Sequence, residues 1–157
     1  MSGFRRGVRL GIDVGKARVG VARCNRDGLL AVPVETVPRT DAAAARITDL
    51  AAEYDAFELL VGLPVSLSGT ETASTEDARA FAAEVAAASG LPVRLVDERL
   101  STVSAHAALR DAGRSQRSSR RIVDQVAAVV LLQQALDVEK STGTPAGALL
   151  PESQENP

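Results

Sequence analysis

Aromatic side chains and cysteines are scarce in this sequence. It contains three Phe, one Tyr and no Trp, so aromatic residues make up 3% of its 157 residues. The core must therefore be built from Ala, Val and Leu, and we do not expect bases to stack on aromatic platforms. The single cysteine, Cys24, excludes an internal disulfide and a metal site of the CxxC type. We interpret Cys24 as a small buried strand residue.

Long apolar runs are also absent. No segment approaches the roughly 20 apolar residues that cross a bilayer, and the charged N-terminus, Met1–Arg6, has no apolar signal core behind it. We therefore expect a cytoplasmic protein with no membrane partner. The length fits one compact domain, predicted over residues 1–140. Residues 141–157 are rich in Pro, Gly and Ser, which predicts a disordered tail.

The apolar pattern predicts an α/β fold. Three short runs, 9–15, 18–23 and 29–37, are separated by turn residues and are typical of an antiparallel meander. The continuous apolar run Phe57–Leu63 is typical of a buried parallel strand, and 92–96 predicts a fifth strand. We therefore predict a mixed five-stranded sheet, three strands antiparallel and then two parallel, flanked by helices. Four helices are predicted. The first begins after a cap at Thr40 or Asp41, and the second begins at Ser74 with Asp77 in a capping box. The third and fourth span 101–112 and 122–136.

Three acidic residues stand at unusual positions in this pattern. Asp13 lies inside the first apolar strand, Glu98 follows the fifth strand, and Asp124 opens the last helix. Each has an ordinary structural explanation: a salt bridge of Asp13 to Lys16 or Arg18, a surface ion pair at Glu98, and a favourable helix dipole at Asp124. If the three elements are neighbours, the carboxylates converge instead on a divalent cation. Mg²⁺ or Mn²⁺ would take such oxygen ligands, which predicts a metal-dependent phosphodiesterase.

Positive charge is concentrated just before the last helix. The segment Arg110–Arg121 contains five arginines and one acid, whereas the whole chain has a net charge of −2. Serines and a glutamine separate the charges, which suits a mobile segment that binds phosphates without reading bases, although a solvated loop fits equally well. From this segment we select Arg117, Arg120 and Arg121 as candidate substrate-binding residues. The single histidine, His106, is interpreted as a surface or half-buried residue outside the site.

Several motifs together resemble those of the YqgF/RuvX family. They occur in the family's order between about Arg9 and Asp137: Gly11-Ile-Asp-Val-Gly15 with Arg18-Val-Gly-Val-Ala22, Val61-Gly-Leu-Pro64 with Ser68-Gly-Thr70, Asp97-Glu-Arg-Leu-Ser-Thr102, and Val123-Asp-Gln-Val-Ala-Ala128. The resemblance implies an RNase H-like fold, similar to that of the RuvC Holliday junction resolvases. It also implies a cytoplasmic nuclease that processes the 5′ end of pre-16S rRNA.

The same resemblance implies roles for individual residues. Asp13, Glu98 and Asp124 would be the catalytic, metal-binding acids, with Asp13 bridging two Mg²⁺ or Mn²⁺ ions, and Arg18 and the loop Gly62–Thr70 would lie near the substrate. Strand alternation puts Asp97 and Glu98 on opposite faces, and we select Glu98 from the motif rather than from the geometry.

The predicted partner is structured nucleic acid. Precursor rRNA or a ribosomal particle is the preferred candidate, and branched DNA is the second candidate. The protein could be a monomer or a homodimer. Two alternatives remain at this point: a Holliday junction resolvase, which would need a two-fold dimer, and a nucleic-acid-binding module without catalysis.

Overall fold

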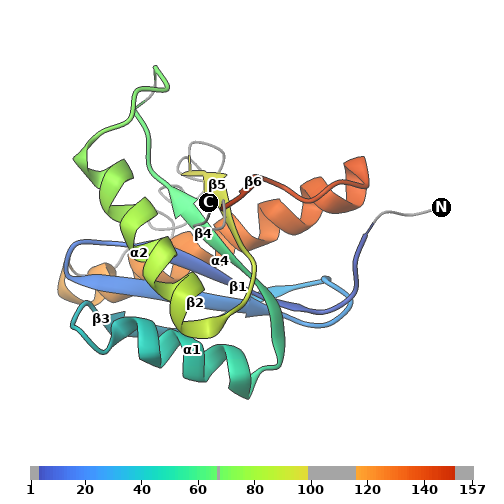
Figure 1. Ribbon diagram of the computed structural model, residues 1–157, viewed down its shortest axis with the longest axis horizontal. Coiled ribbons are helices and arrows are strands. Elements are labelled where there is room, and N and C mark those ends of the chain that lie inside the picture. The colour runs from blue at the N-terminus through green and yellow to red at the C-terminus, as the bar shows by residue number, and fades with distance from the viewer. Residues whose placement is uncertain (1–3, 67, 99–115, 151–157) are drawn as a thin grey trace, which may run out of the picture.

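Six strands form one mixed sheet in the order β3-β2-β1-β4-β5-β6 (Figure 1). The computed structural model describes residues 4–66, 68–98 and 116–150, with the backbone alone described for residues 116–124. The predicted helix 101–112 and His106 lie outside this described part. Of the described helices, none combines the length and the apolar character needed to cross a membrane.

The strands follow the predicted arrangement. The first three, β1 Val8–Val14, β2 Arg18–Cys24 and β3 Ala31–Pro38, are antiparallel neighbours. β4 Ala56–Leu63 runs parallel to β1, and β5 Val93–Asp97 runs parallel to β4. This confirms the predicted fold class of three antiparallel strands followed by two parallel ones.

A sixth strand comes from the segment that was predicted to be a disordered tail. β6, Ala148–Leu149, pairs antiparallel with β5, and the backbone N–H of Leu150 donates to the Val93 carbonyl at 2.7 Å. Ala146 is buried, and Gly147 has a φ of +75° with its backbone against the Leu95 carbonyl. Residues 141–150 therefore differ from the prediction, because the edge of β5 supplies partners that the polar composition did not reveal.

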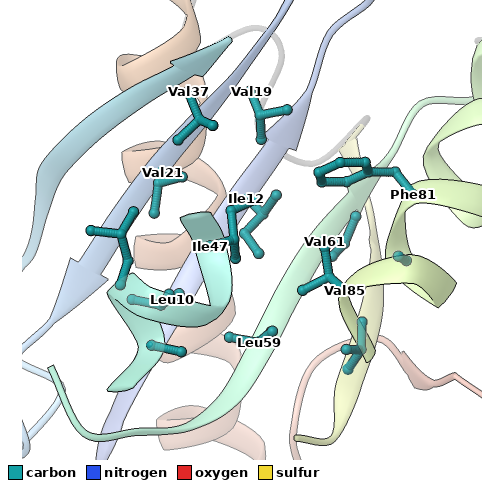
Figure 2. Packing of buried hydrophobic residues seen from close by; sticks show 14 of the residues in the cluster. Leu10, Ile12, Val19, Val21, Val37, Ile47, Leu59, Val61, Phe81 and Val85 are labelled. Carbon is teal, nitrogen blue, oxygen red and sulfur yellow. The ribbon is translucent and has the colours of Figure 1, made fainter. Parts of the chain in front are cut away.

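Two helices cover one face of the sheet. α1 Ala43–Glu53 and α2 Ala73–Ser89 bury apolar residues spaced three and four apart against alternate residues of β1, β2 and β4. Figure 2 shows this packing. The labelled side chains are Leu10, Ile12, Val19, Val21, Val37, Ile47, Leu59, Val61, Phe81 and Val85. Among the described residues, Phe81 is the aromatic side chain that is fully buried in this face. The other buried residues are aliphatic, as the low aromatic content predicted.

The other face is covered by one long helix, α4 Gln116–Thr142. It approaches β1 closely because Gly11 has no side chain: a Cβ there would lie 2.8 Å from the Leu132 Cβ and 2.9 Å from the Ala128 carbonyl oxygen. The helix is longer than the predicted 122–136. Positions 117, 120 and 121 therefore lie in its first turns rather than in a loop.

The starts of α1 and α2 also differ from the prediction. The N-cap of α2 is Thr72, in a capping box with Thr75, instead of Ser74 with Asp77. α1 has Ala42 at its N-cap without a side-chain cap, and the Thr40 hydroxyl accepts the Ala42 N–H at 3.1 Å. The Thr75 hydroxyl also donates to the Pro64 carbonyl, which fixes the start of α2 against the end of β4.

Candidate active site

Asp13 lies near the carboxyl end of β1, on the face that α4 covers. It is partly buried, and it shares this face with Gly11 because alternate strand residues point the same way. Its register partner in β2 is Gly20, and the partner of Gly20 in β3 is Thr36. Asp13 therefore stands in a row that crosses three strands, with glycine as its neighbour on the β2 side.

Glu98 comes to the same face from the other side of β4. Its side chain lies against Gly62, where an added Cβ would come within 2.7 Å of the Glu98 Cγ. Val96, two residues earlier, packs in the core under α4, so alternation turns Asp97 to the opposite face. The geometry thus supports the choice of Glu98 over Asp97.

Gly62 separates the two acids. The last register pair between β1 and β4 is Ile12 with Val61, so Asp13 and Gly62 are neighbours one residue further along. Asp13 and Glu98 consequently flank the same glycine on the same face. We call the ends of β1, β4 and β5 at Asp13, Gly62 and Asp97 the carboxyl edge of the sheet.

The helix turn that contains Asp124 lies over this row. Ala128 packs over Gly11, and the next residue after Asp124, Gln125, donates from its side-chain amide to the Thr36 hydroxyl at 2.8 Å. The backbone at 124–125 is therefore above the row that includes Asp13. The Asp124 side chain itself lies outside the described residues, and among the side chains that are described, no three His, Cys, Asp or Glu form a metal-binding group.

The predicted substrate-binding residues also belong to this end of the molecule. Arg18 opens β2, just after the turn that follows β1, and its carbonyl accepts the Gly15 N–H at 2.9 Å. α4 starts at the carboxyl edge, because Gln125 contacts Thr36 in the row of Asp13, whereas Glu139, near the end of the helix, contacts Arg9 near the beginning of β1. Positions Arg117, Arg120 and Arg121 are therefore at the same edge as Asp13, although their side chains are outside the described part.

A hydroxyl-bearing loop follows β4 at the same edge. The hydroxyls of Ser66, Ser68 and Thr70 are linked in sequence at 2.9 and 3.1 Å, and a bridge between Val65 and Glu71 closes the loop. These side chains are exposed or half-buried. The loop projects away from the sheet before the chain enters α2 (Figure 1).

A pocket opens beside the turn between β1 and β2, on the face covered by α1 and α2. Two cationic residues, Lys16 and Arg39, line it together with three acids, Asp41, Asp77 and Glu84. Its acids outnumber its cations, so it is a poor site for a phosphate group.

A second group of acids is buried at the opposite, amino edge of the sheet. The side chains of Glu58 and Glu139 are 3% and 4% exposed. The Arg5 guanidinium donates to Glu58 at 3.0 and 2.8 Å and to Glu139 at 3.0 and 2.8 Å. Arg94 adds a bond to Glu58 at 2.9 Å, and Arg9 adds one to Glu139 at 3.0 Å. We call these five residues the amino-edge cluster.

Aromatic rings enclose the cluster. The Arg9 guanidinium, 1% exposed, lies 4.6 Å from the centroid of Phe4 and 4.8 Å from that of Phe57. Burial by itself raises the pKa of Glu139, but hydrogen bonds from Arg5 and the positive charge of Arg9 outweigh it and lower that pKa to about 2. Glu139 is therefore an ionised partner of Arg5 and Arg9. No pattern in the sequence predicted this cluster; the available signal was Glu58, an acid within the apolar run 57–63.

Comparison with known proteins defines the class. The structure is similar to that of Thermus thermophilus RuvC in complex with Holliday junction substrate, with a TM-score of 0.55 and 17% identity over 88% of this chain and 99% of that chain. A second Thermus thermophilus RuvC structure gives a TM-score of 0.54. The fold is therefore RNase H-like, with its acids at the carboxyl edge.

The family follows from sequence. The chain belongs to the RuvX family, described as Holliday junction resolvase, which matches residues 7–138. It is 56% identical over 157 residues to a protein of Clavibacter michiganensis, and the match covers 98% of both chains. It is 51% identical to a protein of Streptomyces coelicolor, and that match covers 92% of this chain and 88% of that relative. Both relatives are named "Putative pre-16S rRNA nuclease". The predicted resemblance is confirmed, and the family is one of hydrolases that act on ester bonds.

Proposed function

We propose that this protein is a metal-dependent nuclease that hydrolyses phosphodiester bonds near the 5′ end of pre-16S rRNA, in the cytoplasm. One observation carries the proposal. Asp13 and Glu98 lie on one face of the sheet on either side of Gly62, beneath the turn of α4 that contains Asp124. The names of the relatives from Clavibacter and Streptomyces support the choice of RNA substrate.

The donor set suits a divalent cation such as Mg²⁺ or Mn²⁺. Carboxylate oxygens from separate rigid elements are the ligands that these ions prefer. The Glu98 side chain occupies the space that a side chain at position 62 would fill. The position of Glu98 therefore depends on glycine at position 62. When bound, such an ion would activate a water and stabilise the charge that develops on the phosphate.

The protein's own residues then have separate tasks. Asp13 and Glu98, with Asp124, would hold the cation and orient the attacking water between β1 and α4. Arg18 and positions Arg117, Arg120 and Arg121 at the start of α4 would hold the phosphate backbone, which fixes the scissile bond without reading bases. The hydroxyls of the loop 66–70 would provide neutral donors beside them.

A DNA junction resolvase is the second candidate. The family's description and the fold shared with RuvC favour it. Such an enzyme must present two active sites to paired strands, so it must dimerise on the junction. A monomer that cleaves RNA and leaves a four-way junction intact would exclude this candidate.

Cleavage of matched substrates tests both candidates. A precursor rRNA fragment and a four-way DNA junction are each incubated with purified protein in Mg²⁺, Mn²⁺ or EDTA, alongside Asp13→Asn. We expect metal-dependent cleavage of the RNA that the variant loses while it still binds the RNA. Binding without cleavage under every metal condition would instead identify a non-catalytic nucleic-acid-binding module.

The arginines are tested by the salt dependence of binding. Replacing Arg117, Arg120 and Arg121 with Ala should weaken RNA binding and reduce the slope of log Kd against log salt by roughly one unit per lost phosphate contact. The inactive Asp13→Asn protein serves as background, so that cleavage does not disturb the titration. A slope unchanged by the triple replacement would show that these arginines do not contact phosphate.

A further inference from the structure

Arg39 joins the turn after β1 to helix α2 at the carboxyl edge, although it matches no motif in the sequence. It follows β3, and its side chain is 19% exposed. The Arg39 Nη1 donates to the Gly15 carbonyl at 2.9 Å and to Asp77 at 2.9 Å, and its Nη2 donates to the other Asp77 oxygen at 2.8 Å. One guanidinium thus connects the turn after β1 with helix α2.

The position of this guanidinium is itself fixed. It lies 4.7 Å from the ring centroid of Phe81, which is 1% exposed in the core. The bidentate pair with Asp77 further restricts its rotation, and the hydrogen bonds from Arg39 lower the pKa of Asp77, so the pair is ionised at neutral pH. The backbone N–H of Arg39 also donates to the Ala17 carbonyl at 2.9 Å. Arg39 therefore contacts the β1–β2 turn at two separate carbonyls.

The turn that Arg39 contacts connects two of the predicted site residues. Asp13 lies two residues before Gly15, and Arg18 lies immediately after Ala17. On the other side, Asp77 belongs to the first turns of α2, whose cap Thr72 lies two residues after the hydroxyl-bearing loop 66–70. Any shift of the turn relative to α2 would therefore move the Asp13 carboxylate relative to that loop.

We propose that Arg39 is a positioning residue for this site: it ties the β1–β2 turn to α2 and so holds Asp13 in place for the cation. The proposal rests on the nuclease function proposed above. Arg39 acts from the face covered by α1 and α2, opposite the face of Asp13 and Glu98, so it touches neither cation nor substrate. A carboxylate displaced by about 1 Å can reduce a reaction rate on the order of a hundredfold, so a fixed turn matters for catalysis.

Three variants test this role. Arg39→Gln removes the bidentate pair and the fixed contact with Gly15, whereas Asp77→Asn keeps the contact with Gly15 and weakens only the pair. Arg46→Gln is the matched control, because Arg46 also makes a bidentate pair, with Glu35 at 2.9 and 2.6 Å. That pair joins β3 to α1 and involves neither the β1–β2 turn nor α2. Mn²⁺ affinity by calorimetry, hydrogen exchange of the Gly15–Arg18 amides, and kcat and KM are measured for each.

In Arg39→Gln we expect faster hydrogen exchange at the Gly15–Arg18 amides, an Mn²⁺ affinity reduced about fivefold and a kcat reduced about tenfold. KM should be nearly unchanged. A tenfold change in kcat corresponds to about 1.4 kcal/mol in the activation free energy. Asp77→Asn should lie between this variant and wild type, and Arg46→Gln should match wild type. Mn²⁺ affinity and kcat in Arg39→Gln equal to those of Arg46→Gln would overturn the proposal. A wild-type protein that neither binds Mn²⁺ nor cleaves RNA would instead overturn the proposed function.

Discussion

The two edges of the sheet each gather acidic side chains, but their surroundings differ. At the amino edge, Glu58 and Glu139 lie among Arg5, Arg9 and Arg94, with hydrogen bonds of 2.8 to 3.0 Å. At the carboxyl edge, the backbone beside the acids is glycine: Gly20 is the register partner of Asp13, and Gly62 lies against Glu98. The first arrangement joins chain segments through ion pairs, whereas in the second the missing side chain of Gly62 makes room for the Glu98 carboxylate.

Burial alone would not select Asp13 and Glu98 as candidate site residues. Glu58 and Glu139 are almost fully buried, whereas Asp13 and Glu98 are only partly buried. A search for the most buried carboxylates would therefore select the amino-edge cluster. The neighbouring residues that can be compared differ: arginines surround Glu58 and Glu139, whereas Gly20 and Gly62 lie beside Asp13 and Glu98.

The largest expected effect is at the carboxyl edge. Glu98→Gln should reduce cleavage by about a thousandfold, because charge stabilisation by a bound cation is worth several kcal/mol and each 1.4 kcal/mol is tenfold. Its free energy of unfolding should stay within about 0.5 kcal/mol of wild type. Cleavage kinetics and urea denaturation measure the two quantities, and a folded, fully active variant would contradict the assignment.

The same chemical change at the amino edge should have the opposite outcome. Glu139→Gln leaves Arg9 and part of Arg5 without their buried counter-charge, which should cost about 3 to 5 kcal/mol of the free energy of unfolding. The fraction that remains folded should cleave at the wild-type rate. Urea denaturation tests the loss, and activity per folded molecule separates it from a catalytic defect.

Acid should act on the amino edge in a defined pH range. The folded pKa of Glu139, about 2, lies below its ordinary value of 4.5, so its ionised form stabilises the fold above about pH 4.5. This contribution, on the order of 3 kcal/mol, is lost as the pH falls from about 4.5 toward 2. In Glu139→Gln, the decline of stability across this range should be shallower than in wild type, as urea titrations at each pH would show.

A smaller change tests the space beside Glu98. In Gly62→Ala the new Cβ would overlap the Glu98 side chain, which must move to accommodate it. We expect cleavage to fall by up to about a hundredfold through this displacement. The melting temperature should change little, because the group that moves is a side-chain end. Wild-type activity in this variant would mean that the Glu98 carboxylate does not need its observed position.

Local patterns predicted the strands because each carries its own signal. Apolar runs and turn residues predicted three antiparallel strands followed by two parallel ones, but the position of β4 between β1 and β5, which brings Asp13 and Glu98 together, comes from the structure. Alternation also identified that Asp97 and Glu98 face opposite ways, and the contact of Glu98 with Gly62 shows which one shares the face of Asp13. The combination of all three acids in one site remains a prediction.

Contacts between distant segments could not be predicted in this way. Arg5 and Glu139 are 134 residues apart, so no local pattern marks them as partners. Asp77 was predicted as part of a helix cap, but in the structure it pairs with Arg39, and Thr72 forms the cap. The strand β6 was missed for the same reason, because two residues carry no periodicity and depend on the edge of β5.

The amino-edge cluster also bears on the order in which the chain can fold. Arg9 and Glu58 are made before α4, whereas Glu139, near the end of α4, follows Arg9 by 130 residues. A growing chain that has completed β1 to β5 still lacks the helix that covers one face and the carboxylate that compensates Arg9. Its final packing must therefore wait until the end of α4 has been made. The turn that carries Asp124 belongs to the same helix, so a site that includes Asp124 is completed only when α4 packs on the sheet.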